Sequence, residues 1–159
     1  DDLFPGQFGE LARGQEQPTR RPNNHQGWGR VNVANVVANR NLRLEDDTSG
    51  LSAGQSKEYS VAVTDSKLPL RVTLAYTDAP GVASAQRTLV NDLDVAVEDP
   101  SGRTLYPNNR SGKDDVNNME QVDVLVPATG TYKVTVRAAK VPQGKNGAQP
   151  FALVISTGP

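Results

Sequence analysis

The sequence predicts an all-β protein, an antiparallel β-sandwich in the form of a jelly roll of about eight strands, with one short N-terminal helix. From about Asn39 onward, apolar and polar residues alternate with the period of two that is typical of a half-buried strand. The 159 residues include 14 Gly and 11 Pro, enough to supply turns between many short strands. One buried and one wet face, repeated along the chain, indicate two sheets packed face to face.

The N-terminal part does not follow this pattern. Residues 1–24 have no sustained period and predict an irregular segment, with one helical turn around Glu10–Arg13. The segment GWGRVNVANVVANR then predicts a helix from about Arg30 to Ala38, because its valines can share one face. β-branched residues form a poor isolated helix, so this helix needs packing partners.

The strands follow in order, separated by turn residues. DPSG (99–102) fits a type I turn that joins a hairpin, and ATG (128–130) predicts a second hairpin connection. Ser49-Gly50 marks another break, and Tyr59 and Tyr132 are expected in the core. The expected strands are Leu42–Glu45, Lys57–Thr64, Leu70–Thr77, Asp92–Glu98, Thr104–Tyr106, Glu120–Val126, Thr131–Ala138 and Phe151–Ser156.

Composition excludes several classes of function. A net charge of −1 with scattered Lys and Arg argues against nucleic acid as a partner. No apolar run approaches the roughly 18 residues that span a bilayer, so no membrane insertion is expected. With no cysteine and one histidine, His25 in a PNNH loop, the chain lacks the residues of a zinc site or a serine-protease triad. This chain alone is therefore not expected to be an enzyme.

Oxygen-bearing side chains gather in three segments, YTDAP (76–80), NDLD (91–94) and DDVNNME (114–120). Asp92 and Asp94 project from one face of a strand and repel each other unless a cation or a donor lies between them. Calcium takes such oxygen ligands. The alternatives are solvated loop charges, Asx turns and strand caps. No EF-hand spacing is present, so the residues by themselves leave this choice open.

Several segments carry a resemblance to a known family. PNNHQGWGRVNVANVV (22–37) resembles the end of the catalytic domain of subtilisin-like serine proteases, where a Gly-aromatic-Gly turn leads into the last helix. The rest resembles the C-terminal β-sandwich of one branch of that family. The matching segments are LRVTLAYTDAPG (70–81), TLVNDLDVAVEDPSG (88–102), VNNMEQVDV (116–124), PATGTYKVTVRAAKVPQG (127–144) and QPFALVIS (149–156).

The resemblance implies a division into the tail of a catalytic domain, residues 1–40, and a sandwich domain, residues 41–159. The family's catalytic motifs have no counterpart here, so the serine endopeptidase activity would belong to the parent protein. Relatives bind calcium in the sandwich. The implied ligands are Asp92, Asp94, Asp78, Asn91 and Glu120. Asp92 and Asp94 could equally hold the Asp78 turn or the NNME segment through backbone hydrogen bonds.

Two functions fit the resemblance. In the first, the domain stabilises a secreted protease in cis, with calcium as a possible cofactor and the catalytic domain as partner. Its interface would then include Gly27, Trp28, Gly29 and Arg30. In the second, the domain is a module that binds protein substrate or a surface, which predicts an exposed aromatic or apolar patch.

Overall fold

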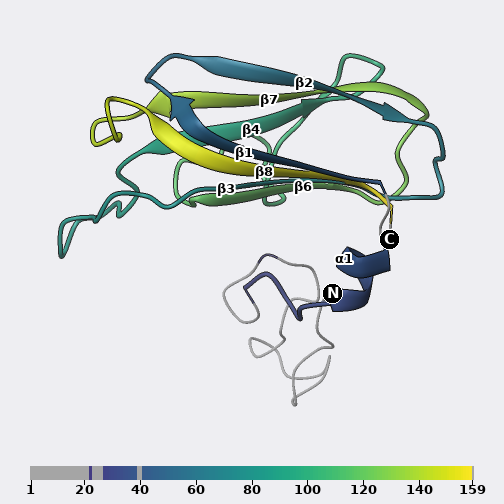
Figure 1. Cartoon of the computed structure of the whole chain (residues 1–159), viewed down its shortest axis with the longest axis horizontal. Helices are drawn as coiled ribbons and strands as arrows, with labels where there is room; N and C mark the ends of the chain where they lie inside the picture. The colour runs from purple at the N-terminus through teal and green to yellow at the C-terminus, as the bar shows by residue number, and fades with distance from the viewer. Residues whose placement is uncertain (1–21, 23–26, 39–40, 159) are drawn as a thin grey trace. The chain divides into compact units, whose positions relative to one another are not determined.

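The computed structural model describes residue 22 and residues 27–38 and 41–158. The chain divides into two compact units, Asp1–Asn39 and Arg40–Pro159. The first unit contains the single helix of the described residues, α1 (Val33–Ala38), and the second contains all eight strands (Figure 1). His25 and the helical turn predicted around residues 10–13 lie outside the described residues.

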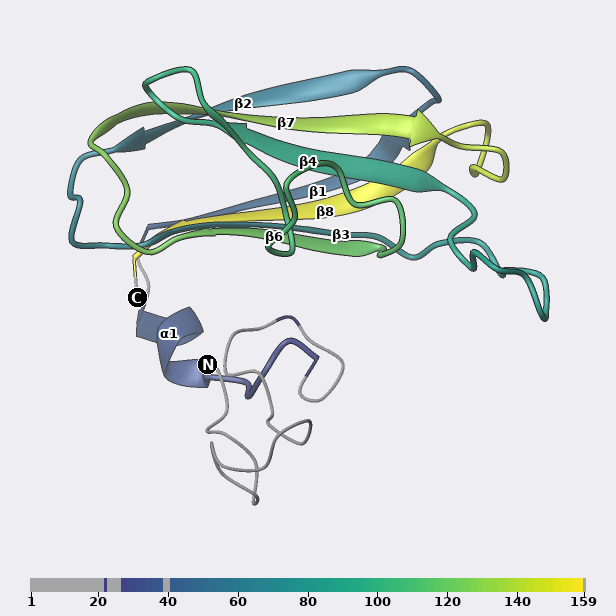
Figure 2. The ribbon, with the colours of Figure 1, turned by 180° about the vertical axis from the view of Figure 1, so that it is seen from behind.

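The eight strands form two four-stranded antiparallel sheets, which confirms the predicted β-sandwich. One sheet has the order β1-β8-β3-β6 and the other the order β2-β7-β4-β5. The two sheets lie one above the other in Figure 1, and Figure 2 shows the same layers from behind. The strands are β1 (Leu42–Leu51), β2 (Ser56–Val63), β3 (Leu70–Ala75), β4 (Asp92–Glu98), β5 (Thr104–Leu105), β6 (Met119–Val124), β7 (Gly130–Lys140) and β8 (Gln149–Thr157).

The pairing follows the rule of a jelly roll. The first strand pairs with the eighth, the second with the seventh, the third with the sixth and the fourth with the fifth. This is the pattern of one long hairpin rolled up so that its strands alternate between two sheets. Two further ladders, β3 with β8 and β4 with β7, complete the sheets.

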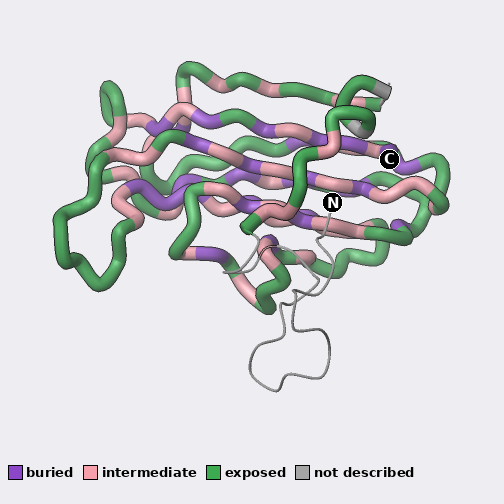
Figure 3. The backbone as a smooth tube through the Cα atoms, turned by 90° about the horizontal axis from the view of Figure 1, so that it is seen from below, coloured by how far each residue is buried: buried purple, intermediate pink, exposed green. Residues whose placement is uncertain are grey.

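The core lies between the sheets and follows the alternation read from the sequence. On β7, Tyr132, Val134, Val136 and Ala138 are all buried, while the residues between them are more exposed. Figure 3 shows buried and more exposed residues alternating in this way along strands of the sandwich. Tyr59 on β2 is buried too, as predicted. Burying one valine or leucine side chain contributes about 1.5–3 kcal/mol, so the many buried side chains between the sheets account for most of the stability of the sandwich.

Strand β1 is longer than predicted. It continues past Glu45 to Leu51 because β8 runs alongside it, with Asp47 opposite Phe151 and, after a register shift, Leu51 opposite Gln149. The predicted break at Ser49-Gly50 is therefore wrong, since these residues lie within the strand. Gly50 has φ +72°, and a Cβ there would lie 2.4 Å from the carbonyl of Gln149, so this irregular step requires glycine.

Of three further predictions about local structure, one is confirmed and two are corrected. DPSG does form the β4–β5 hairpin, with the amide of Gly102 donating to the carbonyl of Asp99 at 2.9 Å. The ATG connection is not a hairpin, because β6 and β7 belong to different sheets. Alternation shows which face of a strand is buried but not which strand is its neighbour. Helix α1 is also shorter than predicted, six residues rather than nine, which accords with the low helix propensity of valine.

Polar side chains close the seam between the edge strands β1 and β2. Asp47 of β1 accepts a hydrogen bond from the ammonium of Lys57 of β2 at 3.0 Å. The guanidinium of Arg43 lies 5.2 Å from the centre of the Tyr59 ring. Long charged side chains thus cover the edge of the core at this seam.

Candidate functional site

The predicted site residues lie at the start of β4 and on the segments around it. Asp78, in the turn after β3, uses both carboxylate oxygens to bind backbone. Oδ1 accepts from the amides of Ala79 and Asn91, each at 2.8 Å, and Oδ2 accepts from the amide of Val90 at 2.7 Å. Asp78 therefore fixes the chain just before β4 through three charge-assisted hydrogen bonds.

Asn91 is fully buried and joins this point to the β7–β8 connection. Its Oδ1 accepts from the amide of Gln143 at 3.0 Å. Its Nδ2 donates to the Gln143 carbonyl at 3.2 Å and to Oε1 of Gln149 at 2.7 Å. Both polar atoms of the amide are satisfied, as a buried side chain requires. Asn91 thus holds two distant segments together.

Tyr76 fixes the same region from the end of β3. Its hydroxyl donates to the carbonyl of Asn91 at 3.0 Å and accepts from the amide of Leu93 at 3.2 Å. Burial raises the pKa of the Tyr76 hydroxyl, so it remains a donor at any ordinary pH. Because the Tyr76 side chain is buried, its ring cannot be part of an exposed aromatic surface that binds a ligand.

Glu120 closes the second seam of the sandwich, between β6 and β4. Strand β4 pairs with β5 only at Val97 and Glu98, which leaves the amide of Val95 without a partner in that ladder. Glu120 of β6 faces inward on the same side as Val122, and its Oε2 accepts from the Val95 amide at 2.7 Å. This contact joins the two sheets where no β5 residue can.

The environment of Glu120 favours its neutral form. The side chain is fully buried, and burial raises the pKa of its carboxyl to about 9 against the hydrogen bond from Val95. The negative charges of Asp94, Asp114 and Asp92 contribute to the same rise as smaller causes. Its second oxygen, Oε1, is buried without a hydrogen-bond partner among the described residues. A carboxylate in this position would be poorly solvated, and the proton removes the charge.

Asp92 and Asp94 do not cap backbone groups, unlike Asp78 and Glu120. Each has a buried Oδ1 with no hydrogen-bond partner within the described part of the chain. The other oxygen of Asp92 lies 3.7 Å from the ammonium of Lys113, a long ion pair. Burial, followed by the charge of Asp92, raises the pKa of Asp94 to about 6, and burial also raises the pKa of Asp92. These two carboxyls therefore retain unused acceptor capacity.

The loop between β5 and β6 contributes another buried acid, Asp114. Its Oδ1 accepts from the amides of Val116 and Asn117 at 3.0 and 3.2 Å. Its Oδ2 accepts from the side-chain amides of Asn108 and Asn117 at 2.6 and 2.7 Å and lies 3.1 Å from Nε of Arg110. Burial raises the pKa of Asp114, but these hydrogen bonds outweigh it and hold the pKa below its usual value.

The structure thus separates the five predicted ligands by role. Asp78 and Asn91 organise backbone, Glu120 joins the sheets, and Asp92 and Asp94 keep a free oxygen each. Across residues 22, 27–38 and 41–158, no group of three or more His, Asp or Glu side chains is placed to hold one metal ion. Sequence reasoning did not single out Asp114. Its spacing before Val116 and Asn117, typical of an Asx turn, could have indicated it.

The predicted interface residues form a turn before α1. Gly27 and Gly29 both have positive φ, +55° and +78°, which explains the two glycines on either side of Trp28. Trp28 is half-buried and Arg30 exposed. Within α1 and just before it, Val31, Val33, Val36 and Val37 are 62–83% exposed.

Fold and site together define the second unit as a jelly-roll β-sandwich domain. No family model matches the chain. The chain is 24% identical over 131 residues to the Dictyostelium discoideum protein named Serine protease/ABC transporter B family protein tagA. That match covers 70% of this chain but 7% of the other protein, so the chain corresponds to a small part of a much longer relative.

The solved structures to which the chain is similar include two bacterial proteins. Bacillus licheniformis lipase BlEst2 in its propeptide form has a TM-score of 0.44 and 14% identity, with 74% of this chain and 22% of that chain covered. Aeromonas hydrophila PliG, a periplasmic inhibitor of g-type lysozyme, has a TM-score of 0.38 and 16% identity, with 72% and 82% covered. In the part of the chain that the structure describes, no helix is long and apolar enough to cross a membrane.

Proposed function

We propose that residues 41–159 are a non-catalytic accessory domain of a secreted, subtilisin-like serine endopeptidase, which they stabilise in cis, and that residues 1–40 are the tail of its catalytic domain. The observation that carries this proposal is the apolar surface of the segment 31–37. Its four valines are 62–83% exposed, and a group of exposed apolar side chains usually marks an interaction surface. A larger hydrophobic core, the catalytic domain, is the occupant we assign to it.

Two further observations support the proposal. The chain has a distant likeness to part of a protein named as a serine protease. The sandwich also has its own core and divides from residues 1–39 as a separate compact unit. A domain of this kind can stabilise its neighbour by binding the folded state alone, which lowers the free energy of that state.

Calcium is the cofactor we propose for this role, with Asp92 and Asp94 as its side-chain ligands. The support is the buried, unpartnered Oδ1 of each residue, since a hard cation satisfies such oxygens. Asp78 and Asn91 already bind backbone amides and are left out of the ligand set. The described residues place no third carboxylate there, so backbone carbonyls and water would complete the coordination, which predicts modest affinity.

The accessory role is tested on the parent protease with and without residues 41–159. We expect the shortened enzyme to lose activity faster on heating, with unchanged kcat/KM on a short chromogenic peptide. If the half-lives at elevated temperature agree and only the cleavage of large proteins falls, the domain is a substrate-binding module instead, and the stabilising role is wrong.

The calcium site is tested on this chain by thermal melts in calcium and in excess EGTA. We expect calcium to raise Tm by several degrees, because a ligand at about 100 times its Kd stabilises by about 2.7 kcal/mol. Asp94→Asn should abolish that difference, whereas Asp65→Asn, in an exposed turn, should keep it. Identical wild-type melts in calcium and EGTA would rule out the site.

A further inference from the structure

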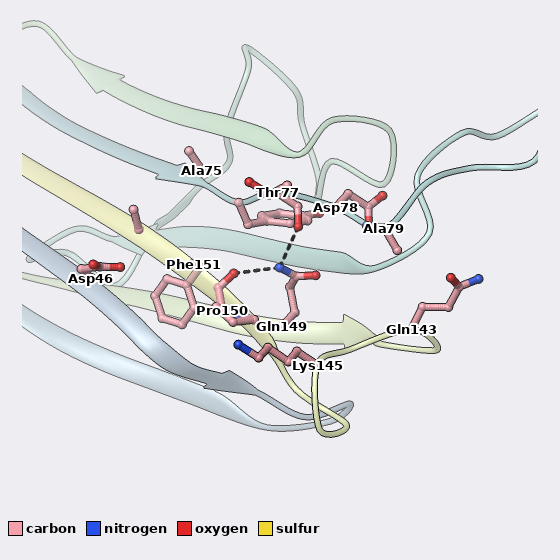
Figure 4. A pocket seen from close by; sticks show the side chains of 12 residues that line it. Asp46, Ala75, Thr77, Asp78, Ala79, Gln143, Lys145, Gln149, Pro150 and Phe151 are labelled. Atoms are coloured by element: carbon pink, nitrogen blue, oxygen red, sulfur yellow. Dashed lines mark hydrogen bonds between the residues drawn. The ribbon is translucent and has the colours of Figure 1, made fainter.

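We propose that a pocket at the Gln149 end of β8 binds extended peptide segments that carry a basic side chain and, a few residues away, a carboxylate. The pocket has a volume of about 630 Å³, within the range of sites that hold small ligands (Figure 4). The choice of peptide, rather than another molecule with both charges, rests on the proposed association with a protease.

The pocket is hollow because small side chains lie side by side on the outer face of one sheet. Asp46 of β1 is opposite Ala152 of β8, and Ala152 is opposite Ala75 of β3. Ala75 and Ala152 point away from the core, since Leu74 and Leu153 next to them in the chain are fully buried. Asp46 points the same way because it is paired with Ala152. The methyl groups of the two alanines leave a depression that larger side chains would fill.

The walls of the pocket are held in place by hydrogen bonds. The side chain of Gln149 donates to the carbonyls of Thr77 and Pro150 at 3.1 and 2.8 Å, as Figure 4 shows. The lining also includes Gln143, whose backbone amide and carbonyl are both hydrogen-bonded to the side chain of Asn91. Walls that are already ordered lose little conformational entropy when a ligand binds, so less binding free energy is lost in ordering the site.

Two charged side chains of the pocket, Asp46 and Lys145, have no charged partner among the described residues. Their charges indicate which ligand the pocket binds. Neither the carboxylate of Asp46 nor the ammonium of Lys145 forms an ion pair or side-chain hydrogen bond with any residue that the structure describes, and both residues are exposed. The third charged group, Asp78, is already bound to three amides. A ligand with a cation for Asp46 and an anion for Lys145 complements the pocket in charge.

The remaining lining favours a peptide backbone over a sugar. Tyr76 and Phe151 are buried and offer no ring face for stacking. The alanines of the lining are small and apolar, which suits a chain of small residues between the two charged ends.

The test measures binding of blocked peptides to the full chain by NMR chemical-shift titration. The first probe is acetylated Lys-Ala-Ala-Glu with an amidated end, and the second is acetylated Lys-Ala-Ala with a free carboxyl end. Comparing them separates a side-chain carboxylate from a chain terminus as the anion. We expect a Kd on the order of 1 mM for the better probe, with shifts at Ala75 and Ala152, and a loss of affinity in high salt.

Substitutions then locate the site. Asp46→Asn and Lys145→Gln should each weaken binding about fivefold, the upper end for an exposed ion pair. Ala152→Leu should abolish it by filling the depression, with an unchanged melting temperature because the position is exposed. Glu58→Gln and Lys67→Gln, which are exposed and outside the pocket, are the matched controls and should bind as wild type does.

Three results would overturn the proposal. They are equal binding of acetylated, amidated tetra-alanine, full affinity in the Ala152→Leu variant, and the absence of saturable shifts at the pocket with either charged probe. None of them bears on the thermal inactivation of the parent enzyme, so this proposal and the stabilising role can fail separately.

Discussion

Replacing Glu120 by glutamine should make the domain more stable at pH 8 and remove the larger part of the dependence of its stability on pH between pH 5 and pH 8. Glutamine keeps an oxygen that can accept from the amide of Val95, now 2.7 Å from Glu120 Oε2, but it has no proton to lose. The carboxyl of Glu120 has a pKa of about 9 in the folded protein and 4.5 as its ordinary value. The unfolded chain therefore releases this proton at much lower pH than the folded protein does.

The sign follows from linkage. A carboxyl whose pKa is raised on folding contributes its full stability below its unfolded pKa, and the contribution is lost as pH rises from about 4.5 towards 9. Between pH 5 and pH 8 this loss is about 4 kcal/mol, since one pKa unit corresponds to 1.36 kcal/mol. Typical domains have a total stability of about 5–15 kcal/mol, so the change is large. Asp94, with a pKa of about 6, adds a smaller loss that is complete by about that pH.

The assay is urea unfolding of wild type and Glu120→Gln at pH 5, 6.5 and 8, in EGTA. We expect the wild-type free energy of unfolding to fall over this range, while the variant keeps only the smaller fall that Asp92 and Asp94 cause. Glu58→Gln, on the exposed face of β2, should follow wild type. A wild-type free energy that is constant from pH 5 to pH 8, or a variant with the same slope as wild type, would refute the reasoning.

Substitutions at Asp78, Gly50 and Asn91 test other contacts. Asp78→Ala releases three backbone amides and should lower the free energy of unfolding by about 3 kcal/mol, measured by urea unfolding, while Asp78→Asn should lower it less because one acceptor remains. Gly50→Ala should cost several kcal/mol, because its Cβ would meet the carbonyl of Gln149. Gly54→Ala, with φ +85° and open space around it, should cost about 1 kcal/mol, and similar melts for the pair would contradict the clash. Asn91→Ala should speed amide exchange at residues 141–149, and unchanged exchange there would show that its three hydrogen bonds do not fix that segment.

Much of the fold could be predicted from the sequence because alternation is a local signal. The residues that face inward on β7 follow directly from TYKVTVRA, and β4 has the predicted bounds. The DPSG hairpin was predictable for the same reason, since proline and glycine set the turn within four residues. Which strands pair with one another could not be predicted in this way. The sequence around residues 119–140 indicated a hairpin, although β6 and β7 lie in different sheets.

The site was harder to predict because its geometry depends on contacts far apart in the chain. NDLD and NNME were recognisable as unusual, but their sequences do not show that Glu120 reaches Val95, 25 residues away. One signal was present, an acid at position 120 on the same face as Val122. The pocket at Asp46 could not be predicted from the sequence, because the neighbouring alanines come from β3 and β8, which are about 75 residues apart in the chain.

The place of β8 in its sheet has a consequence for how the domain is made. β8 is the last strand in the chain, yet it lies between β1 and β3 and forms ladders with both. Until residues 149–157 have left the ribosome, β1 has no neighbour in its sheet and the core side chains of β3 are uncovered on that side. Completion of this domain therefore waits for the end of its own synthesis, while a domain ahead of it can already be folded.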